Sequence, residues 1–320
     1  MNRRVKVITR RSEGDGEMSL VDMRVTVGGL TLQNPVMPAS GTFGEEMAQA
    51  IDFNALGALV TKSVTPLPRT GNRSPRVAET TAGMINSVGI QGKGIAAFVR
   101  AAVPFYRAFS SPLVVSVSAD TADEFAELAA SATAPGVAAL EVNISCPNLE
   151  DDGRSYAMDP LQTRRVLEKV RAATHLPLWA KLTPNTGVLT EVAQAAEAAG
   201  ADALVVANTI LAMAIDVETR KPKIGNVMGG LSGPAVKPII VRMVYQAARA
   251  VRIPIIGCGG VASGNDALEY LLAGASAVQV GTYNFVQPTA MPTIIAELEA
   301  YATRHGVTRI ADLIGAVEQV

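Results

Sequence analysis

The segments Ala199-Gly200-Ala201-Asp202-Ala203-Leu204 and Ala273-Gly274-Ala275-Ser276-Ala277-Val278 follow one pattern, in which a helix ends, a glycine turns the chain and a strand begins. Glycine accepts the left-handed backbone conformation that commonly ends a helix. The apolar residues after it are typical of a parallel strand that is buried on both faces. Leu56-Gly57-Ala58-Leu59-Val60 is a shorter version of the same pattern. The repetition predicts a chain built from consecutive strand and helix units.

Outward from this repeat, eight short apolar runs alternate with alanine-rich segments of helical periodicity. The runs are 34–39, 58–64, 113–119, 139–144, 178–182, 203–207, 255–257 and 277–280. The helical segments are 45–56, 95–107, 123–134, 160–173, 190–199, 235–251 and 266–272. Eight such units in one continuous chain favour an α/β fold of the (β/α)8 TIM-barrel type. An open, doubly wound sheet is the alternative.

Three connections are longer than the ~2–6 residues that usually join a strand to the next helix. They are 65–94, 147–159 and 210–234, and each follows a predicted strand. In a barrel these loops all lie at the C-terminal face, where long loops build or cover a site. We therefore expect long βα loops over that face.

The composition is that of a folded globular chain without a strong charge. Of its 320 residues, 48% are hydrophobic and 18% are charged, and the net charge is 28 − 29 = −1. This balance excludes intrinsic disorder and favours neither nucleic acid nor an anionic membrane as partner. We expect residues 1–18 to form a disordered tail and residues 19–320 a single domain. The absence of a long apolar run and the presence of two cysteines indicate a cytoplasmic protein without a disulfide framework.

Polar side chains stand at the ends of the predicted strands, where barrel enzymes carry their active sites. They are Ser40, Lys62, Ser63, Ser116, Asn143, Cys146, Lys181, Asn208, Thr209, Gly281 and Thr282, the last two as a polar turn. No carboxylate stands among them, which disfavours the paired carboxylates of glycoside hydrolysis. His175 and His305 lie away from this face, so we expect neither histidine catalysis nor a metal site.

Cys146 is the remaining candidate base or nucleophile, because it follows a strand and is surrounded by amide and hydroxyl side chains. Cys258 lies in a glycine-rich strand end and is interpreted as a packing residue.

The last two units predict an anion site. Gly259 and Gly260 precede a predicted helix at Asn265, and Gly281 ends the eighth strand. Glycines allow main-chain N–H groups to approach an oxyanion, and barrels frequently bind a phosphate after strands seven and eight. A phosphate cradle, two lysines and a cysteine suit a flavin mononucleotide (FMN) enzyme, in which Lys181 would stabilise negative charge on the reduced ring.

Several motifs together resemble the dihydroorotate dehydrogenase family. They are Asn143-Ile-Ser-Cys-Pro-Asn148, Ala180-Lys-Leu-Thr-Pro-Asn185, Gly229-Gly-Leu-Ser-Gly-Pro-Ala235 and Ile255-Ile-Gly-Cys-Gly-Gly-Val261. Arg76-Val-Ala-Glu-Thr80, Gly83-Met-Ile-Asn86 and Val88-Gly-Ile-Gln91 resemble the class 1B catalytic subunit in particular. The resemblance runs from about Val25 to Ala300, in the order that the family has.

The resemblance implies a role for each matching residue. Cys146 would remove the C5 proton of dihydroorotate, and the C6 hydride would pass to FMN. Substrate would contact Lys62, Asn86, Ser87, Val88, Gly89, Ile90, Asn143, Asn208 and Thr209. FMN would contact Ser40, Lys62, Ser63, Ser116, Asn143, Lys181, Ala207, Gly233, Gly259, Gly260, Gly281 and Thr282. Ser116 stands where the family usually has the longer asparagine.

The resemblance also implies a pathway and partners. The reaction would form orotate in pyrimidine (UMP) biosynthesis. In class 1B a second subunit carries FAD and a [2Fe–2S] cluster and passes electrons to NAD+, and a homodimer of catalytic subunits joins it in a heterotetramer. Such a cluster generally needs four cysteine ligands, and this chain has two cysteines. The cluster is therefore expected on the partner.

Three alternatives stay open at this point. Lys62 or Lys181 is a possible amine nucleophile of a cofactor-free Schiff-base lyase, since barrels host such chemistry often. A related flavoprotein of the dihydropyrimidine dehydrogenase type would reduce uracil or thymine. A barrel without activity would serve only as a binding subunit, which the intact Lys62, Asn143, Cys146 and Lys181 disfavour.

Overall fold

Eight parallel strands form the central sheet of the computed structural model, which describes residues 21–146 and 155–318. The strands pair in the order β3-β16-β15-β10-β9-β8-β7-β4. Their bounds are β3 Val36–Pro38, β4 Leu59–Val60, β7 Leu113–Val117, β8 Val137–Asn143, β9 Leu178–Lys181, β10 Ala203–Val206, β15 Ile255–Cys258 and β16 Ala275–Val280. Each lies within or close to one of the predicted apolar runs, because these runs can be buried on both faces.

The two edge strands of this sheet approach each other and nearly close it. The N–H of Gly57, just before β4, donates to the carbonyl of Val36 in β3 at 2.8 Å. Between these edges every neighbouring pair is parallel, for example Val278 of β16 beside Val36 of β3. A near-closed sheet of eight parallel strands confirms the TIM barrel, and the open doubly wound alternative is wrong.

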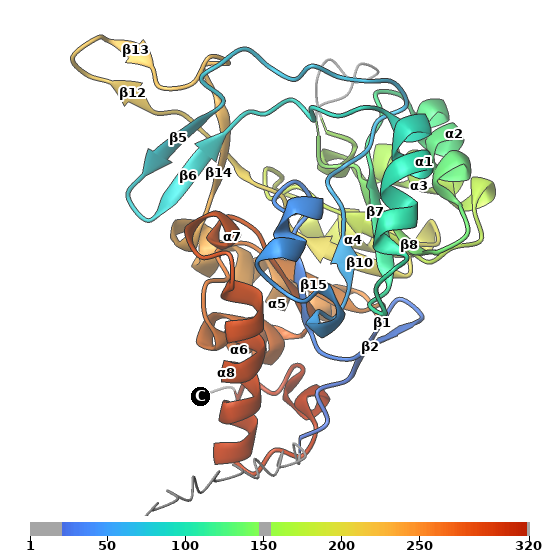
Figure 1. Ribbon diagram of the computed structural model, residues 1–320, viewed down its shortest axis with the longest axis vertical. Coiled ribbons are helices and arrows are strands. Elements are labelled where there is room, and N and C mark those ends of the chain that lie inside the picture. The colour runs from blue at the N-terminus through green and yellow to red at the C-terminus, as the bar shows by residue number, and fades with distance from the viewer. Residues whose placement is uncertain (1–20, 147–154, 319–320) are drawn as a thin grey trace, which may run out of the picture.

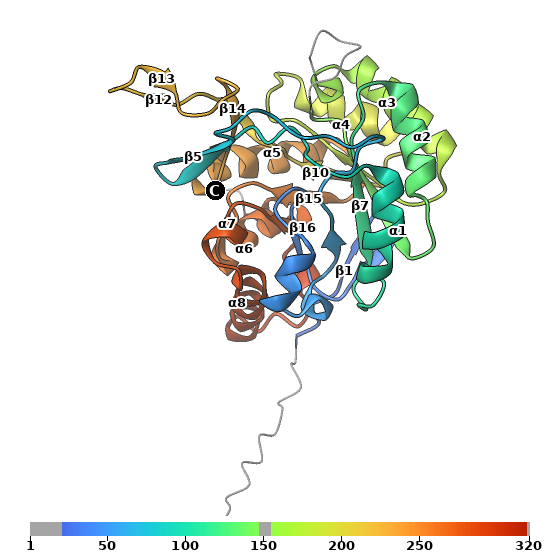
Figure 2. The same cartoon turned by 45° about the horizontal axis from the view of Figure 1, so that its top comes forward.

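Helices surround the barrel on its outer side (Figure 2). They are α1 Ile95–Tyr106, α2 Ala122–Ala132, α3 Pro160–Ala173, α4 Leu189–Ala198, α5 Lys237–Ala250, α6 Gly264–Ala273, α7 Tyr283–Val286 and α8 Ala290–Arg304. Side chains cap the N-termini of α2, α3 and α6. Thr121 and Glu124 form a reciprocal capping box at the start of α2, and the Asp159 side chain accepts the N–H of Gln162 at the start of α3.

One predicted helix is wrong. Instead of a continuous helix over 45–56, the chain forms two short 3₁₀ turns, η1 Glu45–Gln49 and η2 Phe53–Ala55. Asp52 between them is extended, and its side chain accepts the N–H of Asn54. Phe53 is fully buried, with its ring centroid 4.6 Å from that of Phe43. A local cap and the burial of an aromatic ring therefore override the helical periodicity.

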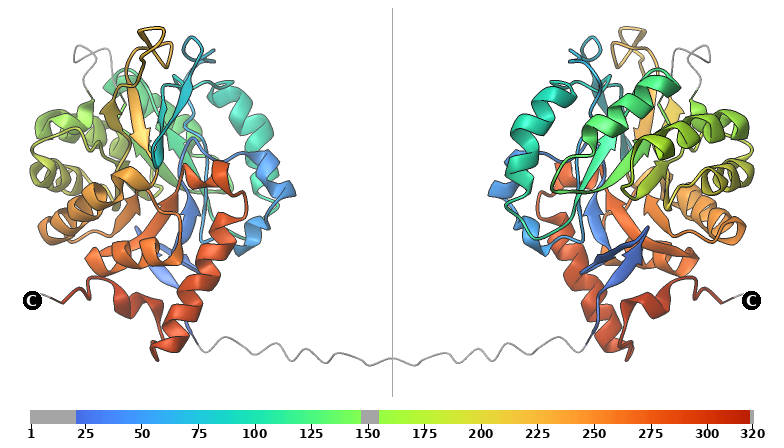
Figure 3. Two further views of the ribbon diagram at one scale, coloured as in Figure 1. Left: turned by 90° about the vertical axis from the view of Figure 1, so that its left-hand side faces the viewer. Right: turned by 90° about the vertical axis from the view of Figure 1, so that its right-hand side faces the viewer.

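Two of the long loops pair with each other. The 65–94 connection forms β5 Val77–Thr80 and β6 Gly83–Asn86, and the 210–234 connection forms β11 Ile210–Ala212 and β14 Gly229–Ser232. These strands make one antiparallel sheet in the order β11-β14-β6-β5. Figures 1 and 3 show this sheet, which we call the roof sheet, at one end of the barrel. The expected cover over the C-terminal face is confirmed.

The remaining elements complete the chain. The hairpin of β1 Val25–Val27 and β2 Leu30–Leu32 lies at the end of the barrel opposite the roof sheet (Figure 3). A second hairpin joins β12 Ile215–Asp216 and β13 Lys221–Pro222, and short 3₁₀ turns are η3 Tyr156–Met158, η4 Pro234–Val236 and η5 Ile310–Leu313. Within 21–146 and 155–318, no helix is both long and apolar enough to span a bilayer. The predicted tail, residues 1–18, lies outside the described residues, and the single domain and cytoplasmic location stay predictions.

Candidate active site

A cavity of about 990 Å³ lies between the C-terminal ends of the barrel strands and the roof sheet. Its volume is at the upper end of the ~300–1,000 Å³ that is usual for small-molecule sites. Lys62, Asn143 and Lys181 reach it from three barrel strands or the turns that follow them. Asn86 at the end of β6 and Gly230 in β14 reach it from the roof sheet. The barrel and the two long loops therefore build the cavity together.

Nearly all of the predicted site residues line this cavity. They are Ser40, Lys62, Ser63, Asn86, Ser87, Val88, Gly89, Ile90, Asn143, Cys146, Lys181, Ala207, Asn208, Thr209, Gly233, Gly259, Gly260, Gly281 and Thr282. Ser116 differs from them: it is fully buried behind Ser63, with the two hydroxyl oxygens 2.9 Å apart. Ser116 therefore supports the cavity wall from behind. Its side chain is shorter than the asparagine that the family usually has, and it does not line the cavity.

Cys146 lies in the cavity wall beside Asn143. The Asn143 Nδ2 group donates to the Cys146 Sγ atom at 3.3 Å. Burial raises the pKa of the Cys146 thiol above its ordinary value, while the hydrogen bond from Asn143 and the positive charge of Lys181 act in the opposite direction. The thiol is thus protonated at neutral pH and becomes a proton acceptor as the pH rises.

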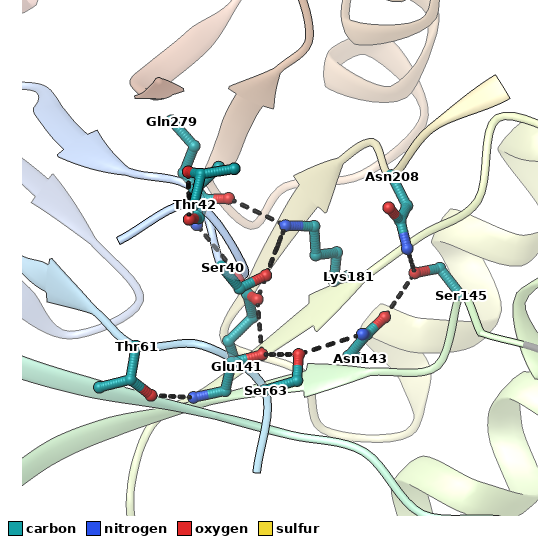
Figure 4. Close-up of polar contacts among 12 residues, drawn as sticks. Ser40, Thr42, Thr61, Ser63, Glu141, Asn143, Ser145, Lys181, Asn208 and Gln279 are labelled. Atoms are coloured by element: carbon teal, nitrogen blue, oxygen red, sulfur yellow. Dashed lines mark hydrogen bonds and ion pairs between the residues drawn. The ribbon is translucent and has the colours of Figure 1, made fainter. Parts of the chain in front are cut away.

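A line of hydrogen bonds crosses the floor of the cavity from β10 to β4 (Figure 4). Asn208 Nδ2 donates to Ser145 Oγ at 2.7 Å, and Ser145 Oγ donates to Asn143 Oδ1 at 2.5 Å. Asn143 Nδ2 in turn lies 3.3 Å from Ser63 Oγ. These bonds hold the amide of Asn143 in one orientation, with its donor group toward Cys146. Ser145 was not among the predicted residues, although it lies between two of them in the sequence.

Lys181 lies at the bottom of the cavity with 3% of its side chain exposed. Its Nζ group donates to Ser40 Oγ at 2.9 Å and to Gln279 Oε1 at 3.2 Å. It also lies 3.7 Å from Glu141 Oε1, forming a buried ion pair. Burial lowers the pKa of Lys181 more than any single neighbour raises it, but the negative charge of Glu141 and the smaller effects of Cys258 and Cys146 together raise the pKa above its ordinary value. The lysine thus presents a fixed positive charge to the cavity.

Glu141 and Gln279 were missed by the sequence analysis, which considered only strand ends. Both are buried within strands, one layer below the cavity. The available signal was a charged residue inside an apolar run, Ala139-Leu140-Glu141-Val142, because a carboxylate is rarely buried without a partner.

Lys62 is the second lysine in the wall of the cavity. Burial lowers its pKa, and the nearby charge of Arg76 lowers it further. A lysine in this state is suited to contact an anionic ligand, and it is also what the Schiff-base alternative requires.

Glycines form a cradle at the side of the cavity next to α6. Gly260 and Gly233 have φ angles of +71° and +97°, which favour glycine. A Cβ atom at Gly260 would lie 2.7 Å from the Gly233 carbonyl oxygen, so a side chain cannot be accommodated there. The N-terminus of α6 follows, capped by Ser263, whose Oγ accepts the N–H of Asp266. A side-chain-free cradle before a helix N-terminus fits the phosphate of a mononucleotide.

The structure also locates Cys258 and the two histidines relative to the cavity. Cys258 is buried, as a packing residue should be, yet it also lines the cavity. His175 and His305 are exposed and lie outside the cavity wall. Among the residues that the structure describes, no cluster of three or more histidine, cysteine or carboxylate side chains is suited to a metal ion.

Comparisons with known proteins agree over nearly the whole chain. A model of the dihydroorotate dehydrogenase family matches residues 22–301. The proteins named dihydroorotate dehydrogenase B (NAD(+)), catalytic subunit, from Trichlorobacter lovleyi and Desulforudis audaxviator are each 51% identical to this chain. The matches cover 92% and 93% of this chain and 98% of each relative. The protein of the same name from Geobacter sulfurreducens is 49% identical over 94% of this chain and all of its own length.

Proposed function

Because the chain belongs to the dihydroorotate dehydrogenase family, and is therefore an oxidoreductase, we propose that it oxidises dihydroorotate to orotate in pyrimidine biosynthesis. The names of its relatives, which are about half identical over nearly their full length, support a catalytic subunit of an NAD+-linked enzyme. The observation that carries the proposal is the position of Cys146 beside Asn143, in one cavity with Lys62 and Lys181.

Cys146 acts as the base. As a thiolate, its Sγ atom takes the proton from C5 of dihydroorotate, while a hydrogen leaves C6 with its electron pair and the C5–C6 double bond of orotate forms. The Asn143 amide stabilises the thiolate as a hydrogen-bond donor and is itself held by Ser145. A positioned base of this kind usually contributes a rate factor of ~10²–10⁴.

FMN, when bound, supplies the acceptor for the two electrons and the hydrogen that leave C6. We propose that Gly233, Gly259, Gly260, Gly281 and Thr282 would hold its phosphate, and that Lys181 would contact its ring. Ser40, Lys62, Ser63, Asn143 and Ala207 complete the cofactor contacts, and Ser116 holds Ser63 from behind. The fixed charge of Lys181 favours the negative charge that a reduced flavin ring carries.

Dihydroorotate carries carbonyl groups, N–H groups and a carboxylate, so its site needs donors and acceptors in fixed directions. We propose that Lys62 and the segment Asn86, Ser87, Val88, Gly89 and Ile90 bind it from the side of the roof sheet. Asn143, Asn208 and Thr209 bind it from the barrel. The line of hydrogen bonds from Asn208 through Ser145 to Asn143 holds two of these amides relative to Cys146.

Electrons must then leave the protein. We propose that a partner subunit with FAD and a [2Fe–2S] cluster carries them to NAD+, and that a homodimer of this chain joins it in a heterotetramer. The words "catalytic subunit" in the names of the relatives support a partner. The two cysteines of the chain also fall short of the four ligands that such a cluster generally needs.

The visible spectrum of the purified protein tests this proposal. We expect a flavin band that bleaches when dihydroorotate is added without oxygen, and that does not bleach with dihydrouracil, which lacks the carboxylate. Bleaching by dihydrouracil alone would favour the dihydropyrimidine alternative. A colourless protein that borohydride and substrate modify at Lys62 or Lys181 would contradict the proposal and favour the lyase.

A further inference from the structure

Glu141 is a carboxylate inside the barrel that the proposed reaction does not use. It lies on β8, two residues before Asn143, and is fully buried below the cavity. Ser116 Oγ donates to its Oε1 atom at 2.9 Å, and Gln279 Nε2 donates to its Oε2 atom at 2.7 Å. Lys181 Nζ lies 3.7 Å from Oε1. Figure 4 shows Glu141, Lys181 and Gln279 close together.

The Glu141–Lys181 pair is costly to bury. Removing two charges from water is offset only when they lie close together and their remaining hydrogen-bonding groups are satisfied. Here both oxygens of Glu141 accept hydrogen bonds, and Lys181 donates to Ser40 and Gln279 as well. Apolar side chains could fill the same space at a lower free-energy cost of burial. The complete polar network therefore indicates a role for the two charges.

The first consequence of the network concerns the charge of Lys181. The ionisable groups whose charges reach Lys181 are Glu141 from β8, Cys146 after β8 and Cys258 at the end of β15. Both thiols have raised pKa values because they are buried, so they are neutral near neutral pH. Glu141, 3.7 Å from Lys181 Nζ, is then the neighbouring negative charge that favours the protonated form of this buried lysine.

The second consequence concerns the direction of the hydrogen bonds. An ionised carboxylate only accepts, so Ser116 uses its proton for Glu141. Ser63, 2.9 Å away, then donates to Ser116, and its oxygen is left to accept from Asn143 Nδ2. The same Nδ2 group donates to Cys146. The buried carboxylate therefore sets the direction of a chain that ends at the proposed base.

We propose that Glu141 is a positioning residue of the reaction, which keeps Lys181 charged at the proposed FMN site and orients the Ser116–Ser63–Asn143 chain toward Cys146. This inference rests on the proposed function for what Lys181 and Cys146 do. The pairing of Glu141 with Lys181 is a property of the protein without cofactor.

The first test therefore uses the apoprotein. In Glu141→Gln the shape is kept but Lys181 loses its counter-charge, so burial favours its neutral form in the folded state only. The unfolded chain then binds more protons than the folded one, and stability rises with pH. We therefore compare the urea concentration at the unfolding midpoint at about pH 6 and about pH 8, both below the range in which the thiols titrate. Between these two pH values the midpoint should increase more in Glu141→Gln than in wild type.

Matched variants identify the cause. Glu79→Gln removes the same charge from an exposed residue of the cavity rim and should follow the wild-type pH dependence. The double variant Glu141→Gln, Lys181→Gln removes both charges, so its unfolding midpoint should also have the wild-type pH dependence. A Glu141→Gln variant with the wild-type pH dependence would overturn the proposal. If this variant does not fold, folding of the double variant would support the proposal, and failure of both would overturn it.

The second test measures the midpoint potential of bound FMN. In Glu141→Gln we expect a potential more negative than wild type near pH 8, with a smaller difference near pH 6, where Lys181 regains its proton. Glu141→Asp keeps the charge and should restore the wild-type pH dependence. An unchanged potential, or one that is more positive at both pH values, would contradict the role of Glu141. Failure of the wild type to bind FMN would instead contradict the proposed function, while the apoprotein test would still apply.

Discussion

Neighbouring groups shift the pKa of the Cys146 thiol in opposite directions. Burial raises the pKa of its thiol, whereas the donor group of Asn143 and the charge of Lys181 stabilise the thiolate. The result is a thiol that is protonated near neutral pH and that accepts a proton from substrate only after it has lost its own. Cys258, in the same cavity wall, is also buried, and here the charge of Glu141 reinforces the rise in pKa while that of Lys181 opposes it. The two thiols therefore provide a natural comparison.

Replacing Cys146 by alanine should separate catalysis from cofactor binding. We expect Cys146→Ala to keep the flavin band but to lose a factor of ~10²–10⁴ in the rate of anaerobic bleaching by dihydroorotate. Stopped-flow absorbance measures this rate. Cys258→Ala, the matched thiol deletion, should bleach within a few-fold of wild type. A Cys146→Ala variant as fast as wild type would remove this residue as the base.

The raised pKa of Cys146 also predicts a pH dependence. The base works as a thiolate, so the rate of flavin reduction should increase with pH and level off above the pKa of an ordinary thiol, ~8.5. Single-turnover reduction measured across this range gives the profile. The residual rate of Cys146→Ala should lack this rise. A rate that decreases as pH increases would contradict a thiolate base.

At the scale of elements, the cradle depends on two backbone segments that approach each other closely. Gly260 follows β15 and Gly233 precedes η4, and a Cβ atom at Gly260 would meet the Gly233 carbonyl oxygen. The approach brings the β14–η4 turn against the start of the segment that leads into α6. A phosphate can be held there by main-chain groups because no side chain occupies the space.

Substituting Gly260 should therefore weaken FMN binding through crowding rather than through backbone strain. Gly315 has nearly the same φ angle, +72° against +71°, but a Cβ atom there meets no atom within 4 Å. We expect Gly315→Ala to lose ~1–2 kcal/mol of unfolding free energy from its positive φ alone, and Gly260→Ala to lose more, because its Cβ atom also meets the Gly233 carbonyl oxygen. Only Gly260→Ala should lose about tenfold or more in FMN affinity, measured by fluorescence titration of the apoprotein. Equal FMN affinity of the two variants would contradict the cradle.

At the scale of the whole molecule, the barrel and the roof sheet have separate parts in the site. The barrel supplies Cys146, Lys181 and the buried polar network, whereas the roof sheet supplies one wall of the cavity. The roof sheet forms only when β6 from one connection pairs with β14 from another, with Ile85 opposite Leu231. The wall that the roof sheet supplies therefore requires both connections.

If a partner subunit carries electrons to NAD+, the isolated chain should catalyse only the first half of the reaction. Purified by itself, it should reduce its FMN with dihydroorotate but should give little NADH when NAD+ is added. Absorbance at the NADH band measures this. Adding the FAD and [2Fe–2S] subunit should restore NAD+ reduction. Rapid NAD+ reduction by the chain alone would contradict the need for a partner.

The barrel and most of the cavity can be predicted from the order of the amino acids alone. Apolar runs and glycine turns are local patterns, and in a parallel barrel the ends of strands must meet at one face, so residues such as Asn143 and Lys181 follow from position along the chain. Local patterns failed at 45–56, where the cap at Asp52 and the burial of Phe53 override a helical periodicity. The resemblance to a known family added the roles that position alone does not indicate.

The depth of each polar group and its contacts follow from the three-dimensional fold and not from local sequence. Glu141 is paired with Lys181 and Gln279, which come from other strands, and Ser116 lies behind Ser63. The pairing of β6 with β14 likewise joins segments more than a hundred residues apart. Contacts of this kind depend on strand register and on packing across the barrel. The local periodicity of the chain does not predict them.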